Sequence, residues 1–394
     1  MVDERERAHW VAFNHAPGIG PRRVRRLLDR FGSLAAAWMA SRRELAQAEL
    51  DRRTLEGLDA LRRRLEPERE LARVRQLGAE AITWQDGAYP ARLAAIADPP
   101  PLLYVRGGLG AGDDLPVAVV GTRRPTFYGR DVAERLAAGL AAAGATVVSG
   151  LARGIDTCAH RGALRGGGRT VAVLAHGIDF VYPSENRRLA DQIVAQGALV
   201  TDYPAGTHPA GENFPPRNRI IAGLSAGVLV VEAGEGSGAL ITSHYAAEQG
   251  RDVFAVPGPI TSPASRGCNL LIQDGAKLVT GLEDVLEELR PALPSAQLRQ
   301  LALDFGTPDG ERGRASGRMA PPHPWTRASW ACWRTPGWKS TRISWRESWD
   351  CRCRRSPAPS PCWRCWARCA TPALCTTPPP LAELPADILG FGAP

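Results

Sequence analysis

Six short apolar runs, rich in β-branched residues, recur along the middle of this chain of 394 residues, and a segment long enough for a helix separates each run from the next. The runs lie at residues 116–121, 146–150, 170–177, 198–203, 227–233 and 252–258. Apolar strands that alternate with helices form a parallel sheet that helices cover on both faces. The sequence therefore predicts a doubly wound α/β fold with a mostly parallel sheet.

The residues on either side of these runs predict further domains. Residues 1–75 are rich in Leu, Ala, Arg and Glu with helical periodicity, which indicates a small helical domain. Within it, residues 17–21 (PGIGP) resemble the glycine hairpin of a helix-hairpin-helix, which can meet a DNA phosphate; the alternative is a tight turn beside solvated arginines. We expect a linker and edge segment over 76–115, the sheet domain over 116–290, and a second linker and a tail over 291–394.

The formal net charge of +8 comes from the tail. Residues 1–310 hold 36 basic and 36 acidic side chains, whereas residues 311–394 hold 13 and 5. An anion site in the main body must therefore come from a local cluster of arginines. No apolar run approaches the roughly 20 residues that cross a bilayer, and the chain opens with alternating charges rather than an apolar signal segment. We therefore expect a cytoplasmic protein with no membrane partner.

The composition of the tail is unlike that of an ordinary cytosolic domain. Seven of nine cysteines and eight of eleven tryptophans lie beyond residue 320. Cys362, Cys365 and their neighbours would suggest a zinc site, but no second well-spaced CxxC pair follows. Codons for Trp and Cys both begin with TG. Reading the gene one base earlier would therefore turn every Trp and Cys codon of the tail into a codon for Leu, Val or Met. We therefore expect a frameshift from about residue 311, which replaces a small helical domain with a disordered tail.

The ligand site of an open α/β sheet lies at the carboxyl ends of its strands, where helix N-termini point into a crevice. Gly121, Thr122 and Arg123 follow the first run. The glycine permits a tight turn, and the guanidinium can clamp a phosphate. The segment is not GxGxxG, and no acidic residue ends the second run, which argues against NAD or FAD. The alternative for Arg123 is an ion pair with a nearby carboxylate.

A second glycine-rich turn follows the next run at residues 149–156 and contains Ser149, Gly150 and Arg153. We expect it to face the same crevice, with Asp156 as the structural N-cap of the following helix. No Ser or Cys nucleophile is placed to form a triad with Asp156 and the histidine four residues further on. We therefore interpret that histidine as a packing residue.

The densest polar cluster surrounds the start of a helix that turns apolar at once. Its members are Asn213, Phe214, Arg217, Asn218 and Arg219. An aromatic face beside guanidinium groups can stack an unpaired base while holding its phosphate. The alternative places the phenylalanine in the core and both arginines in surface salt bridges.

A glycine-rich loop at residues 232–242 opens a helix at Gly238, and Ser237, Gly238 and Thr242 would line an anion site there. Glu235 in this loop is expected to be solvated rather than to act as an acid or base. The sequence predicts no catalytic residue, no metal ligand and no cofactor.

Taken together, these segments resemble the DNA-processing protein A (DprA/Smf) family from about residue 80 to residue 290. The matching segments are YPARLAAIADPPPLLYVRG, VAVVGTRRPTFYG, SGLARGIDTCAH, GIDFVYPSEN, NFPPRNRIIAGLS, EAGEGSGALITSHYAAEQGRDVFAVPG and GCNLLIQDGAKLV. The resemblance implies an extended Rossmann-like domain without a dinucleotide, preceded by a small helical domain of the helix-hairpin-helix or SAM-like kind and often followed by a winged helix. It also implies a non-catalytic protein that binds single-stranded DNA, forms a homodimer and loads the RecA recombinase during natural transformation.

The resemblance also assigns roles to individual residues. Arg123 would clamp a phosphate near the amides of Ser149 and Gly150. The stacking and electrostatic wall would consist of Phe214, Arg217 and Arg219. Family members often carry a lysine a few residues before the Phe-Pro pair, where this chain has Gly211 and Glu212, and this departure bears on the strength of DNA binding.

A second class of function stays open because the sheet also resembles hydrolases that cleave the base from a nucleoside monophosphate. Those relatives use a PGGxGTxxE loop. The corresponding loop here reads EAGEGSGALIT, without PGG and without the acid at that spacing. A purely structural nucleotide sensor is a third possibility.

Overall fold

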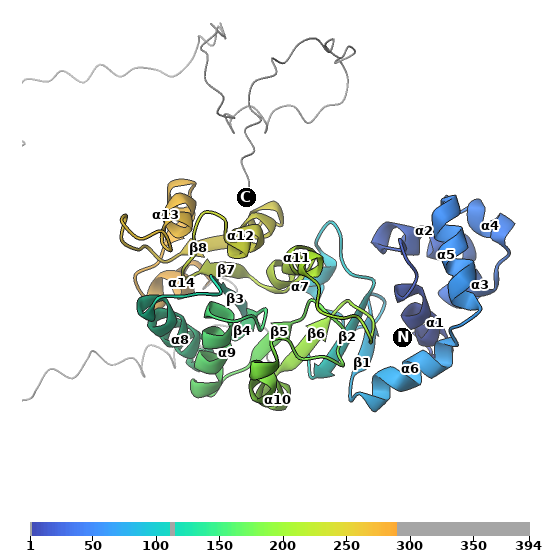
Figure 1. Cartoon of the computed structure of the whole chain (residues 1–394), viewed down its shortest axis with the longest axis horizontal. Helices are drawn as coiled ribbons and strands as arrows, with labels where there is room; N and C mark the ends of the chain where they lie inside the picture. The colour runs from blue at the N-terminus through green and yellow to red at the C-terminus, as the bar shows by residue number, and fades with distance from the viewer. Residues whose placement is uncertain (1, 111–114, 290–394) are drawn as a thin grey trace, which may run out of the picture. The chain divides into compact units, whose positions relative to one another are not determined.

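The computed structural model describes residues 2–110 and 115–289. These residues form a nine-stranded sheet in the order β1-β2-β6-β5-β4-β3-β7-β8-β9 (Figure 1). The strands are β1 (Glu80–Thr83), β2 (Leu102–Gly107), β3 (Pro116–Val120), β4 (Thr146–Ser149), β5 (Thr170–Val173), β6 (Ala198–Thr201), β7 (Gly227–Val230), β8 (Asp252–Ala255) and β9 (Lys277–Leu278). β2 pairs antiparallel with β1 and with β6, and every other pairing is parallel.

Both faces of the sheet are covered by helices. Alternate side chains of a strand point to opposite faces, so Val117 and Val119 of β3 belong to one core, and Ala118 and Val120 to the other. The face that carries Val117 and Val119 packs against α8 (Phe127–Ala142), α9 (Ile155–Arg165), α10 (Arg187–Gln196) and α14 (Leu282–Leu289). The face that carries Ala118 and Val120 packs against α7 (Ala91–Ala94), α11 (Phe214–Leu224), α12 (Gly238–Glu248) and α13 (Arg266–Gln273) (Figure 1). Burial on both faces explains why the parallel strands are almost entirely apolar.

The order of the strands reverses between β3 and β7. From β3 the chain adds β4, β5 and β6 on one side, and it then crosses to the other side to add β7, β8 and β9. At such a switch point the loops after the two neighbouring strands separate and leave a crevice at the carboxyl edge of the sheet. The fold therefore directs a ligand to the loops that follow β3 and β7.

Six helices precede the sheet: α1 (Glu4–Asn14), α2 (Pro21–Phe31), α3 (Leu34–Met39), α4 (Arg42–Ala46), α5 (Arg52–Arg62) and α6 (Pro67–Gln76). They share a hydrophobic core with β1, β2 and α10. Polar contacts join the same parts of the molecule: the guanidinium of Arg7 lies 2.6 Å from a carboxylate oxygen of Asp86, and the hydroxyl of Tyr104 donates to the side chain of Asn14 over 3.0 Å. The helical region thus packs directly on the antiparallel edge of the sheet.

The turn at residues 17–21 lies between α1 and α2. Gly18 has a positive φ of 78°, and the guanidinium of Arg23 donates to the carbonyl oxygen of Gly18 and pairs with Asp51. Internal partners therefore occupy this arginine. A contact of the turn with DNA stays a prediction.

The predicted fold class is confirmed: each of the six runs contains a strand, and these six strands are parallel to one another. The segment expected to be a linker and edge supplies β1 and β2, which extend the sheet in the antiparallel direction. The expected frameshifted and disordered tail and the alternative zinc site at Cys351, Cys353, Cys362, Cys365 and Cys369 lie outside the described residues. Within the described residues, none of the helices has the length and apolar character needed to cross a membrane.

Candidate functional site

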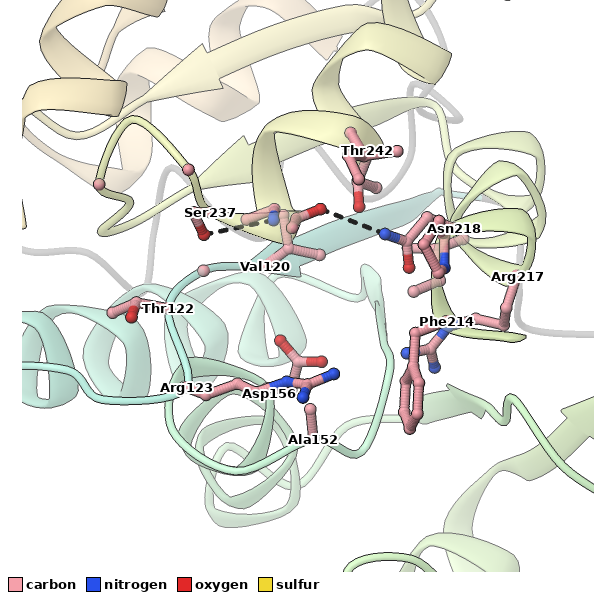
Figure 2. A pocket seen from close by; sticks show the side chains of 18 of the residues that line it. Val120, Thr122, Arg123, Ala152, Asp156, Phe214, Arg217, Asn218, Ser237 and Thr242 are labelled. Carbon is pink, nitrogen blue, oxygen red and sulfur yellow. Dashed lines mark hydrogen bonds between the residues drawn. The ribbon is translucent and has the colours of Figure 1, made fainter. Parts of the chain in front are cut away.

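A pocket of about 560 Å³ opens at the switch point, between the loops after β3 and β7 and the start of α11 (Figure 2). Nine of the fourteen residues predicted to form the binding site line it: Gly121, Thr122, Arg123, Phe214, Arg217, Asn218, Ser237, Gly238 and Thr242. Three segments far apart in the sequence therefore meet where the strand order predicts a ligand site.

The ring of Phe214 is the contact point of two guanidinium groups. The guanidinium carbon of Arg123 lies 4.8 Å from the centre of the ring, and that of Arg217 lies 5.8 Å from it. Both distances fall within the range of a cation–π interaction. Arg123 is exposed, and among the described residues it has no hydrogen bond or ion pair from its side chain (Figure 2). Arg123 can therefore meet an anion without breaking a hydrogen bond or an ion pair.

Arg217, in contrast, is buried, with 3% of its surface exposed. Its guanidinium donates to the carbonyl oxygen of Gly150 over 2.9 Å and also to that of Val173. Burial lowers the pKa of Arg217 to about 10, against the raising effect of the nearby carboxylate of Asp156. The group stays protonated at neutral pH, so it places a fixed positive charge in the wall of the pocket.

Asp156 balances this charge. It is buried, and one carboxylate oxygen accepts from the backbone N–H of Gly150 at 3.2 Å. Burial raises the pKa of Asp156 to about 6, while the charge of Arg217 opposes this rise. The prediction that Asp156 is the helix N-cap is wrong, because α9 has Gly154 as its N-cap and Asp156 lies in its first turn. Its structural role is to compensate Arg217 and to hold the turn after β4.

The amide of Gly150, which was predicted to lie near the phosphate bound by Arg123, has a partner inside the protein. The N–H of Gly150 is directed at Asp156, and its carbonyl oxygen accepts from Arg217. Ser149 is fully buried, and its hydroxyl donates to the carbonyl oxygen of Val119 at 2.7 Å. Both residues lie beneath the pocket rather than in its lining, so they support the site without facing its opening.

The loop that carries Arg123 is held by Glu232, a buried residue after β7. The N–H of Thr122 donates to the carbonyl oxygen of Glu232 over 2.7 Å. The carboxylate of Glu232 accepts from the backbone N–H and the hydroxyl of Thr126, at 2.8 and 2.7 Å. Since Thr126 is the N-cap of α8, Glu232 joins the loop after β7 to the start of this helix.

Gly154 fixes the other side of the same loop. Its φ of 81° favours glycine, and a Cβ at this position would lie 2.3 Å from the carbonyl oxygen of Thr122. The next residue, Ile155, donates its N–H to that same oxygen over 3.2 Å. The close approach of the two turns thus depends on the absence of a side chain.

The opposite wall of the pocket is built by α11 and the start of α12. The side-chain amide of Asn218 donates to the carbonyl oxygen of Gly238 over 3.2 Å, and the hydroxyl of Ser237 accepts from the N–H of Ala239 over 3.3 Å (Figure 2). Thr242 follows one turn later on α12 and also lines the pocket. These contacts orient polar groups of both helices toward one cavity.

Besides Ser149 and Gly150, three predicted residues do not line this pocket. Arg219 pairs with Asp202 at 2.8 Å and donates to the carbonyl oxygen of Asp98, Arg153 pairs with Glu185 at 3.0 Å, and Asn213 is only half-buried in the turn before α11. Arg219 therefore forms a surface salt bridge, as the alternative interpretation predicted. Arg217 is buried, so it forms neither a surface salt bridge nor an exposed part of the wall that would hold a phosphate. The structure does not bring Arg219 into the wall with Phe214.

Tyr182 lies beside Phe214 and is not among the residues predicted from the sequence. The residue is 41% exposed, and the centre of its ring lies 6.1 Å from that of Phe214. The signal available was its place in GIDFVYPSEN, one of the segments that carry the family resemblance. A second ring beside Phe214 enlarges the surface on which flat groups can stack.

The pocket offers positive charge and N–H donors but little that would hold a metal. Residues 2–110 and 115–289 contain no group of three or more His, Cys, Asp or Glu placed to hold a metal ion. The arrangement suits an anion with an attached flat group, because a guanidinium meets the anion while an aromatic ring meets the flat group.

A doubly wound sheet with its site at the switch point, and without a dinucleotide fingerprint, defines a Rossmann-like ligand-binding protein. The model of the family described as DNA recombination-mediator protein A matches residues 80–290. Protein Smf of Synechocystis is 41% identical over 289 residues, which are 72% of this chain and 73% of that protein. The chain therefore belongs to the DNA-processing protein A (DprA/Smf) family.

Two further comparisons concern the same relative. The DNA processing protein DprA of Streptococcus pneumoniae is 48% identical over 203 residues, which are 52% of this chain and 72% of that protein. The X-ray structure of DprA from Streptococcus pneumoniae superposes with a TM-score of 0.64 at 36% identity and covers 71% of this chain and 97% of that one. The match confirms the predicted family and the fold.

Proposed function

We propose that this protein binds single-stranded DNA without transforming it chemically. The observation that carries the proposal is the ring of Phe214 in contact with the guanidinium groups of Arg123 and Arg217. Proteins that bind single strands combine aromatic rings, on which bases stack, with positive charges that follow the backbone. The exposed Arg123 would meet a phosphate, while Phe214 would meet a base.

The buried Arg217 has a different part in this proposal. It is buried, and one nitrogen of its guanidinium donates to two backbone carbonyl oxygens, so it would act on DNA through its charge and through the position it gives Phe214. Asn218, Ser237 and Thr242 would supply neutral polar contacts on the opposite wall. The sequence-predicted roles of Arg219, Arg153 and Asn213 at this pocket have less support, because they do not line it.

The alternative, a nucleoside monophosphate hydrolase, has less support from the carboxylates near the pocket. Glu232 accepts two hydrogen bonds from Thr126, and Asp156 compensates Arg217. A hydrolase needs a carboxylate that can reach the sugar or a water molecule. Incubation of the protein with nucleoside monophosphates would distinguish the two functions, because only the hydrolase releases free base.

Titration of labelled oligo-dT, with and without its complementary strand and at several salt concentrations, tests the binding proposal. We expect the single strand to bind more tightly than the duplex. The Arg123→Ala variant should weaken binding and reduce the salt slope by about 0.7, the value for one lost phosphate contact on a single strand. Equal affinity for duplex would contradict the proposal.

We further propose that the protein works in the cytosol as a homodimer that loads the RecA recombinase onto single strands during natural transformation. Membership of the family described as DNA recombination-mediator protein A supports this assignment. Light scattering would measure the oligomeric state. RecA filament growth on DNA precovered with single-strand-binding protein would measure loading, and an unchanged filament rate with added protein would contradict it.

A further inference from the structure

A second hollow, of about 530 Å³, lies beside the pocket and shares part of its lining. Its walls come from the loop after β3, from α8 and from the turn and first half of α9. Five arginines line it: Arg123, Arg124, Arg130, Arg153 and Arg161. We call these five residues the arginine cluster. Glu185 is the single carboxylate among the lining residues, which leaves a formal excess of four positive charges.

Most of this charge has no partner within residues 2–110 and 115–289. Only Arg153 forms an ion pair, with Glu185, at 3.0 Å through two nitrogens. Arg130 donates to the carbonyl oxygen of Pro125 over 3.3 Å, a contact that neutralises no charge. All five arginines are exposed. Like charges held together without counterions repel each other, so the cluster would be stabilised by a bound anion.

The hollow lies next to the DNA pocket proposed above, because Arg123 and Arg124 line both cavities. Its remaining lining residues include no aromatic side chain on which a base could stack. A ligand held here would therefore be bound through its negative charges, and a strand that leaves the pocket past Arg123 would meet Arg124 next.

We propose that the arginine cluster is a second phosphate subsite, which binds the sugar–phosphate backbone of nucleotides next to those held at Phe214. This inference rests on the proposed function and extends it: a strand long enough to occupy both cavities gains affinity from the cluster, whereas a strand that fills only the pocket does not. Because backbone phosphates carry no sequence information, the gain should be the same for every base composition.

The double variant Arg130→Ala/Arg161→Ala tests the subsite, because both side chains line only the second hollow and neither forms an ion pair within the described residues. Affinity would be measured for oligo-dT of about five and about twenty nucleotides, lengths that bracket the usual site sizes. We expect about a tenfold loss for the long strand, with a salt slope reduced by about 1.4, and no loss for the short one.

The matched control is Arg165→Ala, which removes an arginine of α9 that lies one turn after Arg161. Arg165 pairs with Glu134 at 3.1 Å and does not line either cavity, so this variant should leave both affinities unchanged. An equal loss for short and long strands, or no loss for either, would overturn the subsite while the proposed function stands. A wild-type protein that binds neither oligonucleotide would overturn the proposed function and the subsite together.

Discussion

The guanidinium of Arg217 donates to the carbonyl oxygen of Gly150 over 2.9 Å, and this hydrogen bond joins helix α11 to the turn after strand β4. The same guanidinium lies 5.8 Å from the centre of the Phe214 ring, and its charge offsets that of the buried carboxylate of Asp156. A single side chain therefore fixes the ring that faces the ligand and balances a buried negative charge. Its loss should affect folding as well as binding.

The first prediction concerns this double role. Arg217→Ala removes the charge that offsets the buried carboxylate of Asp156, and it also removes the donor to the carbonyl oxygens of Gly150 and Val173; the loss of buried charged groups of this kind costs roughly 3–5 kcal/mol. We expect the free energy of unfolding in urea to fall by about that amount. Arg123→Ala is the control: this exposed side chain makes no hydrogen bond within the described residues, so its removal should change stability by less than about 0.5 kcal/mol. Equal stability of the two variants would contradict the buried-pair argument.

Much of this arrangement follows from the sequence. The six β-branched runs predict the parallel sheet, and their order along the chain places the polar segments at strand ends. Three strands were not predicted individually: β1 and β2 lie in the segment expected to be a linker and edge, where three prolines precede β2, and β9 has only two residues, too few for a periodic signal. The place of β1 and β2 in the sheet is decided by packing against the helical region, and that of β9 by its pairing with β8, rather than by local preference.

The burial of Arg217 could have been predicted from helical spacing. In a helix that begins at Phe214, residues three, four and seven positions further on share its face, which gives Arg217, Asn218 and Ile221. All three line the pocket with Phe214, whereas Arg219, five positions on, points elsewhere. What the sequence does not show is the partner: Asp156 comes from another turn, and only the tertiary fold brings the two charges together.

The second prediction follows from the position of Arg219. Its guanidinium pairs with Asp202 at 2.8 Å and does not line the pocket. Arg219→Gln should therefore leave the affinity for a single strand within about twofold, while Arg123→Gln, the same change inside the pocket, should lower it several-fold. Fluorescence anisotropy on both variants measures the difference. If the two losses were equal, Arg219 would belong to the binding surface after all.

The third prediction concerns the dependence of stability on pH. His160 is fully buried, and its Nδ1 lies 2.7 Å from the Thr170 hydroxyl, which itself donates to the carbonyl oxygen of Val147. Burial, followed by the charge of Arg217, lowers the pKa of His160 to about 3. The unfolded chain binds a proton near pH 6.5, so this group removes stability as the pH falls from about 6.5 to about 3.

Asp156 has the opposite effect, because its pKa rises to about 6 in the folded protein. The folded state holds the extra proton, so stability increases as the pH falls from about 6 to about 4. Of these two opposing effects on stability, only that of Asp156 is left in His160→Gln. Relative to wild type, this variant should gain up to about 1.4 kcal/mol for each pH unit between 6 and 4, whatever its stability at pH 7. Asp156→Asn should show the reverse sign in the same urea titrations, and equal pH slopes in all three proteins would contradict both shifts.

The fourth prediction is a gain of affinity at the rim of the pocket. Gly211 lines the cavity, a Cβ there would meet no heavy atom within 4 Å, and its φ is not positive, so a longer side chain fits without strain. Gly211→Lys places a flexible cation beside the position proposed for a phosphate, where the chain now has the exposed Glu212. We expect a single strand to bind several-fold more tightly, with a salt slope steeper by about 0.7.

Gly211→Gln is the matched variant, because it adds a side chain of similar length without charge. It should leave the salt slope unchanged, since the slope counts the phosphates neutralised by cations rather than the contacts made. An affinity gain of equal size in both variants would mean that Gly211→Lys acts through packing or through the turn before α11. A gain confined to the lysine variant would show that the rim at residue 211 lies within reach of the DNA backbone.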